Sequence, residues 1–164
     1  MNYLLSQLSS YNIFNYLLPG ILFVVAAEAF TDYSFLQRDL VVGVFVYYFI
    51  GMAVSRFGSL VVEPILKKVS WVTFADYSDF VAASKNDSKI ELLSETNNTY
   101  RTLFSTLLLL ALLVLWQYIE ARASWLGERS GILLLVALMV LFLFSYRKQT
   151  SYVKRRVEAN GADE

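Results

Sequence analysis

Four long uncharged stretches dominate the sequence, at residues 1–27, 40–55, 102–119 and 130–146. The hydrocarbon core of a bilayer is roughly 30 Å thick, and a helix of about 20 apolar residues spans it. Flanking residues extend the shorter stretches to that length, so we expect transmembrane helices near 13–30, 40–60, 103–119 and 131–146. The alternative, a soluble four-helix bundle, requires polar outer faces, which the runs LLLLALLVL and ILLLVALMVLFLF lack.

The composition agrees with an integral membrane protein and narrows its chemistry. Of the 164 residues, 57% are hydrophobic and 17% are charged, and the chain contains no Cys and no His. Zinc sites, Ser-His triads and thiol nucleophiles need those missing residue types. The sequence also has no P-loop, no GxGxxG motif and no catalytic carboxylate pair. We therefore expect no enzyme, no metal site and no cofactor.

The distribution of Lys and Arg predicts the orientation of the chain. Five basic residues lie between 67 and 101, five lie in the tail beyond 146, and three lie in the two short loops. Because basic residues favour cytoplasmic loops, we expect the middle segment and both termini in the cytoplasm. No Lys or Arg precedes the first apolar run, which indicates a retained span rather than a cleaved signal peptide.

The expected fold class is all-α: four transmembrane helices, a cytoplasmic helical extension between the second and third, and an oligomeric bundle. The predicted segments are a first hairpin with an N-terminal interfacial part (1–66), a cytoplasmic helical insert (67–102), a second hairpin (103–146) and a basic cytoplasmic tail (147–164). Pro64 predicts that the second helix stops or bends there. Ser88 and Glu91 have the spacing of a capping box. Residues 88–126 contain no Pro or Gly, which predicts one long helix that continues into the third span.

Small residues recur at four-residue spacing on the second helix, at Gly51, Ser55 and Ser59. Small residues let transmembrane helices approach closely. The stripe therefore indicates either an interface between subunits or packing against the chain's own first helix. We expect a homo-oligomer, with a tetramer favoured, because four helices of one chain cannot enclose an aqueous path.

The cytoplasmic part of the third helix has two faces of interest. Ile90, Leu93, Asn97 and Tyr100 follow heptad spacing, which indicates that these extensions associate as a bundle. The polar residues of the same extension predict either a wet vestibule or gate, or a solvated helix face; they are Ser94, Asn97, Asn98 and Arg101.

The tail segment YRKQTSYVKRR carries a cluster of five basic residues, Arg147, Lys148, Lys154, Arg155 and Arg156. Such clusters next to a span usually contact anionic lipids and fix topology. In an oligomer, a ring of these tails is also suited to an anionic ligand, with phosphates on Arg and bases on Tyr. Both interpretations stay open at this point.

The stretches NYLLPGILF, YYFIGMAVSRFGSLVVEPILKK and IELLSETNNTYRTLF lie in an architecture that resembles the small membrane effectors of bacterial anti-phage systems, such as the Hailong and Kiwa membrane components. The resemblance covers the whole chain. It implies an effector that is held inactive until infection and then permeabilises or depolarises the inner membrane. Some such effectors respond to a nucleotide or nucleic-acid signal from a partner enzyme.

The expected function is therefore a ligand-controlled pore-forming or membrane-disrupting effector that acts in abortive infection. Its expected partners are the lipid bilayer, further copies of the chain, and a cytoplasmic enzyme with its nucleotide or single-stranded oligonucleotide product. The first alternative is a non-conducting anchor or scaffold for a cytoplasmic partner. The second is a small ion-coupled transporter, for which Glu28 and Arg56 are the charges nearest the hydrocarbon.

Overall fold

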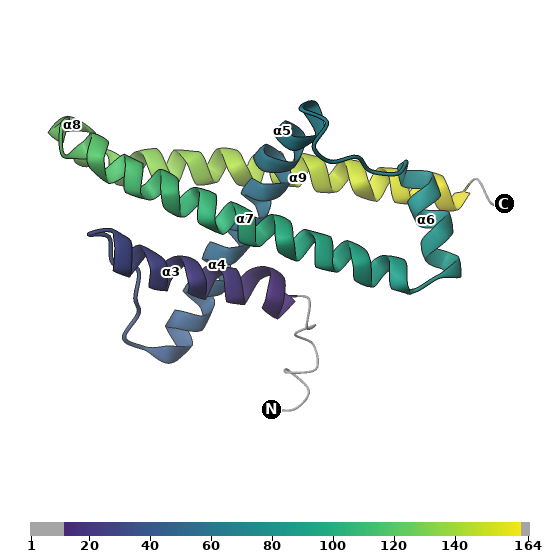
Figure 1. The fold of residues 1–164 in the computed structure, drawn as a ribbon, viewed down its shortest axis with the longest axis horizontal. Coiled ribbons are helices and arrows are strands. Elements are labelled where there is room, and N and C mark those ends of the chain that lie inside the picture. Colours follow the sequence, from purple (N-terminus) through teal and green to yellow (C-terminus); the bar gives the residue numbers. More distant parts are fainter. Residues whose placement is uncertain (1–11, 162–164) are drawn as a thin grey trace.

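The computed structural model describes residues 12–161, and every element in that range is a helix (Figure 1). The elements in chain order are η1 (Ile13–Leu17), α3 (Leu18–Phe30), α4 (Leu40–Phe57), η2 (Gly58–Val62), α5 (Glu63–Lys68), α6 (Tyr77–Asn86), α7 (Lys89–Glu120), α8 (Ser124–Gly127) and α9 (Ser130–Gly161); η1 and η2 are π-helical turns. The expected all-α class is confirmed. The predicted interfacial segment before residue 12 and the last three residues of the tail lie outside the described residues.

Four helices are long and apolar enough to cross a membrane: Ile13–Phe30, Leu40–Lys68, Lys89–Glu120 and Ser130–Glu158. Large apolar side chains cover their outer surfaces; Leu135 and Leu143, for example, are 59% and 66% exposed. The buried side chains are mostly polar, among them Asn15, Thr102 and Ser105. A water-soluble domain has the opposite distribution. The protein is therefore built for a lipid environment.

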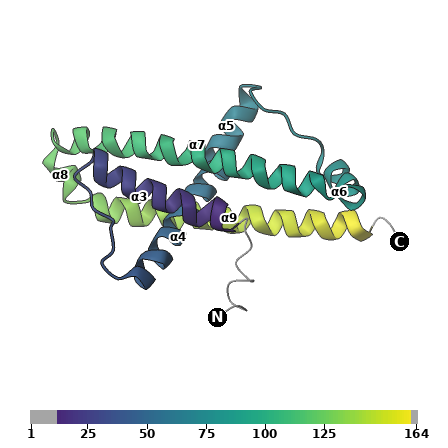
Figure 2. The same ribbon diagram turned by 60° about the horizontal axis from the view of Figure 1, so that its bottom comes forward.

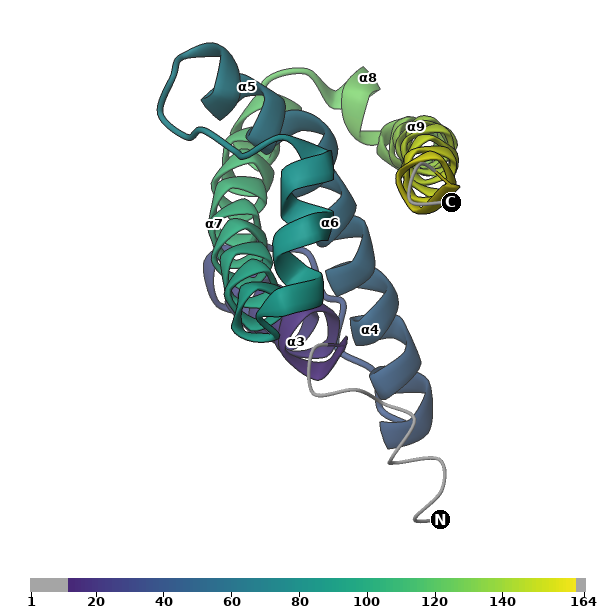
Figure 3. The same ribbon diagram turned by 90° about the vertical axis from the view of Figure 1, so that its right-hand side faces the viewer.

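The two longest helices, α7 and α9, run in roughly parallel directions and are joined through α8 at one end (Figure 1). A view along both helices shows α4 running between them (Figure 3). Helix α3 packs against α4 and α7, and α4 crosses it steeply (Figure 2). At the far end, α6 reaches α9, where the Tyr77 and Tyr152 rings have centroids 6.2 Å apart. We call the end with α5, α6 and the last turns of α9 the basic end, and the end with residues 31–39 and α8 the loop end.

Each π-helical turn lies just before a proline. In η1 the Leu18 N–H bonds the carbonyl of Ile13, and Pro19 follows. In η2 the Glu63 N–H bonds the carbonyl of Gly58, and Pro64 follows. A π turn widens the helix where the proline ring would otherwise clash with the preceding turn. A stop at Pro64 is wrong, because the wider turn lets the helix continue to Lys68, and a bend there stays a prediction.

The first two spans meet at a glycine contact. A Cβ atom built on Gly51 would overlap the carbonyl oxygen of Tyr16, and one built on Gly20 would overlap the carbonyl oxygen of Tyr47. The two backbones therefore touch, and only glycine permits that distance. At Gly51 the small-residue stripe packs against the chain's own first helix.

The long helix α7 agrees with the sequence prediction, but its N-terminal cap does not. Its 32 residues run without interruption, so it is about 48 Å long. Ser88 stands at the N-cap and makes no side-chain capping bond. The Asp87 carboxylate accepts from the Lys89 N–H at 2.9 Å instead. The predicted capping box is therefore wrong, and Asp87 rather than Ser88 accepts the hydrogen bond from the Lys89 N–H.

Candidate functional site

A buried carboxylate, Glu63, is the centre of the candidate site. The Glu63 side chain is 8% exposed and lies at the start of α5. Its oxygens lie 2.6 Å from Arg101 Nη1 on α7, 3.1 Å from Lys67 Nζ and 3.7 Å from Lys148 Nζ on α9. One negative and three positive charges thus meet here. The cluster ties α5, α7 and α9 together and carries a surplus of positive charge.

The π turn and the proline explain why Lys148 joins this cluster. In a regular helix the Ser59 carbonyl would accept from the Glu63 N–H, but that N–H bonds Gly58. The next residue is Pro64, which has no N–H to offer. The free Ser59 carbonyl accepts from Lys148 Nζ at 2.7 Å, as does the Ser59 hydroxyl. An irregularity of the second span therefore creates the binding site for a cation of the fourth.

A second polar cluster lies next to the first and joins η1, α4 and α7. Asn15 Nδ2 donates to Ser55 Oγ at 3.2 Å, and Thr102 Oγ1 donates to Asn15 Oδ1 at 2.8 Å. Asn15 and Thr102 are almost completely buried. Hydrogen bonds of this kind connect helices in a membrane, where water supplies no alternative partner. The two clusters together connect all four candidate spans towards the basic end.

A cavity of about 1150 Å³ opens beside both clusters, and we call it the central cavity. Its lining residues include Tyr16 and Ser55, and the others come from α4 to α7 with the 72–76 segment, and from α9. Its cations are Arg56, Lys67, Arg101 and Arg155, its acids are Glu63 and Asp76, and its aromatic residues are Tyr16, Phe74, Tyr77, Phe80 and Tyr152. The cavity is larger than the roughly 300–1,000 Å³ of common small-molecule pockets.

Several donors in the central cavity are not used by the protein itself. Arg56 and Arg155 form no ion pair within residues 12–161. Arg101 Nε is buried and has no hydrogen-bond partner in this part of the chain. Buried donors are nearly always satisfied in folded proteins. Arg56 and Arg155 are therefore the cations that the cavity offers to an anion.

The structure brings together the four residues that the sequence predicted for a vestibule or gate. Ser94, Asn97, Asn98 and Arg101 all line the central cavity from α7. Their role in a conduction path stays a prediction.

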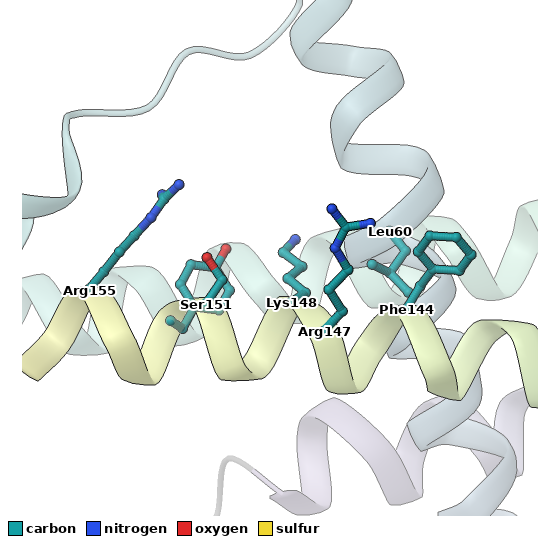
Figure 4. Close-up of a pocket in the computed structure, with 7 residues that line it drawn as sticks. Leu60, Phe144, Arg147, Lys148, Ser151 and Arg155 are labelled. Atoms are coloured by element: carbon teal, nitrogen blue, oxygen red, sulfur yellow. The ribbon is translucent and has the colours of Figure 1, made fainter.

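The five basic residues of the tail are distributed over different surroundings. Arg147, Lys148 and Arg155 line a smaller cavity against η2, and Arg155 also reaches the central cavity (Figure 4). Lys154 pairs with Glu158 at 3.7 Å on the exposed side of α9, and Arg156 lines neither cavity. They do not form one continuous site within the chain.

The small residues of the second span also have partners inside the chain. Ser55 belongs to the Asn15 cluster, and Ser59 belongs to the Glu63 cluster. Together with Gly51 they use the contacts expected for packing within one chain. A further role between subunits stays a prediction.

Sequence reasoning missed the central residue of the site. Glu63 is a single acid at the end of the second apolar run, with Lys67 one turn later. Asn15 is likewise the only amide in the predicted first span, 13–30. An isolated polar residue in a predicted span or directly after one is the signal that could have found both.

A separate polar cluster fastens the loop end. Glu120, the last residue of α7, accepts hydrogen bonds from the Tyr33 hydroxyl, the Trp116 indole and the Ser130 hydroxyl. Burial and the adjacent carboxylate raise the pKa of the Tyr33 phenol to about 12. The cluster holds the 31–39 loop and the start of α9 on the end of α7.

The fold and these sites define an all-helical protein with four candidate membrane spans. Compared with known protein families, curated proteins and solved structures, the chain shows no significant match.

Proposed function

We propose that the protein is a ligand-controlled, pore-forming effector of the bacterial inner membrane that acts in anti-phage defence as a homo-oligomer, with a tetramer favoured. The observation that carries the proposal is the cation-lined central cavity, whose ion pairs join α5, α7 and α9. A control site must bind a ligand and must also be connected to the helices that move. The cations that line the central cavity support the first requirement, and the ion pairs that reach α5, α7 and α9 support the second.

The charges and aromatic rings of the central cavity favour an anionic ligand with bases. Four cations face two acids there, and Glu63 is already neutralised by its partners. Phosphates suit the free guanidinium groups, and exposed rings such as Phe74 are suited to stacking with bases. We infer that the ligand is a nucleotide or a short single-stranded oligonucleotide made by a cytoplasmic partner enzyme.

Competition for Arg101 supplies a mechanism of control. A phosphate that enters the central cavity reaches the same guanidinium that Glu63 holds at 2.6 Å. In this mechanism, ligand binding weakens the ion pair between Arg101 and Glu63, and so weakens the contact between α7 and α5. In the proposed oligomer, the bound polyanion clamps the mouth of the pore, and its loss shifts the population towards an open state.

The α7 extension supports self-association. Leu92, Leu93 and Tyr100 are between 62% and 68% exposed in the chain, on the part of α7 before its most apolar stretch. Apolar side chains grouped outside the bilayer usually mark an interaction surface. In the proposal, copies of this extension form the bundle around the pore.

The alternative function, a non-conducting membrane anchor, draws on a different observation. In the most apolar 18 residues of each span, only 6% are buried in the fourth span, against 28% in the first. Helix α9 therefore leaves most of its surface for lipid or for the spans of another protein. The transporter alternative has less support, because Glu28 is exposed and the buried Glu63 is held by three cations.

Ion flux through reconstituted vesicles tests the proposal. The full chain is placed in vesicles, and potassium flux is measured with ATP or a short mixed-sequence single-stranded DNA on both sides. We expect flux without a probe and a decrease with at least one of them. Absence of flux under all conditions would support the anchor instead. Flux that neither probe changes would contradict ligand control.

A further inference from the structure

A second cavity, of about 310 Å³, lies where α9 leaves its apolar stretch and meets η2. Its apolar part consists of Leu60 and Phe144. Its polar part comes from one face of α9, at Arg147, Lys148, Ser151, Tyr152 and Arg155. Figure 4 shows the side chains of α9 rising from the same side of the helix, with Arg147 directed towards Leu60. An apolar half and a basic half therefore meet at the boundary of the span.

The positive charge of this cavity is only partly used. Lys148 is held by Ser59 and Glu63. Arg147 and Arg155 have no ion pair among the residues that the structure describes. The hydroxyl of Ser151 lines the cavity between them in sequence, one helical turn from each. Two guanidinium groups and a hydroxyl group thus face the same small volume.

We propose that this cavity binds the headgroup of an anionic phospholipid. The phosphate lies on Arg147 and Arg155, near the Ser151 hydroxyl, and the acyl chains extend over Leu60 and Phe144. One guanidinium group can donate two parallel N–H···O hydrogen bonds to a phosphate. Basic pockets between helices at the membrane boundary are typical sites for anionic headgroups. The volume is at the lower end of the range for ligand pockets, which suits a headgroup and is small for a nucleotide chain.

The lipid site adjoins the proposed control site, and Tyr152 and Arg155 line both cavities. Arg147 lines only the smaller one. A change at Arg147 therefore tests the lipid site without altering the walls of the central cavity. Arg156 is a matched control, because it is the same residue type on the same helix and lines neither cavity.

Native mass spectrometry of the full chain in mild detergent provides the test. Wild type, Arg147→Gln and Arg156→Gln are each mixed with equal amounts of phosphatidylglycerol and phosphatidylcholine. We expect wild type and Arg156→Gln to retain phosphatidylglycerol preferentially. We expect Arg147→Gln to lose about fivefold of that preference, as one basic residue contributes about 1 kcal/mol near an anionic lipid. Arg147→Lys should restore part of it. Arg147 is exposed, so its replacement leaves the fold intact.

Competition with soluble anions distinguishes a lipid from a free phosphate. Inorganic phosphate and glycerol phosphate share the charged group but lack acyl chains, so we expect neither to displace phosphatidylglycerol. Displacement by either would show a phosphate site and overturn the lipid proposal. An equal loss in Arg147→Gln and Arg156→Gln, or no preference in wild type, would also overturn it.

Discussion

Glu63 shows how one residue organises the basic end. Its carboxylate faces Arg101, Lys67 and Lys148, and the Pro64 that follows leaves the Ser59 carbonyl free for the same lysine. Placing a charge away from water is costly unless it is paired and hydrogen-bonded. The arrangement satisfies the acid fully and leaves its cations partly free for a ligand.

Replacing Glu63 with Gln should destabilise the protein by about 2–3 kcal/mol. Breaking a buried pair usually costs 3–5 kcal/mol, and the partial exposure of Lys67 and Lys148 reduces that value. The midpoint of thermal unfolding in detergent checks this. Lys154→Gln is the control, because its ion pair with Glu158 is exposed and contributes less than about 1 kcal/mol. Equal midpoints for the two variants would contradict the role of Glu63.

Tyr33 gives a pH-dependent signature at the loop end. Its pKa of about 12 is raised above the ordinary value of 10.0, so the neutral phenol is favoured in the folded state. The stability from this contact is complete below pH 10 and is lost as the pH rises through 12. A spectrophotometric titration should lose one late-ionising tyrosine in Tyr33→Phe. An unchanged titration curve would show that Tyr33 is not the group concerned.

At the scale of the helices, the glycine contact and the π turns set the positions of the clusters. The close approach of the first two spans at Gly20 and Gly51 brings Asn15 to Ser55, and η2 directs Ser59 to Lys148. π turns are frequent at functional sites because they change which groups a helix presents. The glycine contact and the π turn, rather than the regular parts of the helices, therefore set the positions of the two polar clusters.

Gly51→Ala should lower stability by about 2 kcal/mol, because its methyl group would overlap the Tyr16 carbonyl and force the spans apart. Gly131→Ala is the matched control, since nothing lies within 4 Å of an added Cβ there. It should leave stability unchanged or slightly higher. The midpoints of thermal unfolding of Gly51→Ala and Gly131→Ala in detergent test this prediction. A stable Gly51→Ala protein would mean that the spans can separate without loss.

The sequence was sufficient for the helices and insufficient for the contacts between them. Long apolar runs determine spans whatever their neighbours are, and the predicted α7 flank indeed lines the central cavity. The Glu63 cluster depends on how α9 packs against η2, which no local pattern contains. For the same reason Lys148 is separated from Lys154 and Arg156, although all belong to one basic run.

At the scale of the molecule, the basic end should face the cytoplasm. The parent chain has no Cys, so single cysteines report their own accessibility. Ser78 in α6 and Ser34 in the 31–39 loop are both exposed and lie at opposite ends. We expect an impermeant thiol reagent to label Ser34→Cys but not Ser78→Cys in spheroplasts. The reverse pattern would invert the topology predicted from Lys and Arg.

In the proposed function, the central cavity controls the permeability of the membrane. Arg56 lines the cavity and has no ion pair within the described chain, so Arg56→Gln removes a ligand contact and leaves the Glu63 cluster intact. The deciding measurement is membrane current in planar bilayers as single-stranded DNA is titrated. We expect the half-inhibitory concentration to rise about fivefold or more in Arg56→Gln and to stay unchanged in Arg156→Gln. Identical inhibition curves for wild type and Arg56→Gln, or the absence of any current, would contradict it.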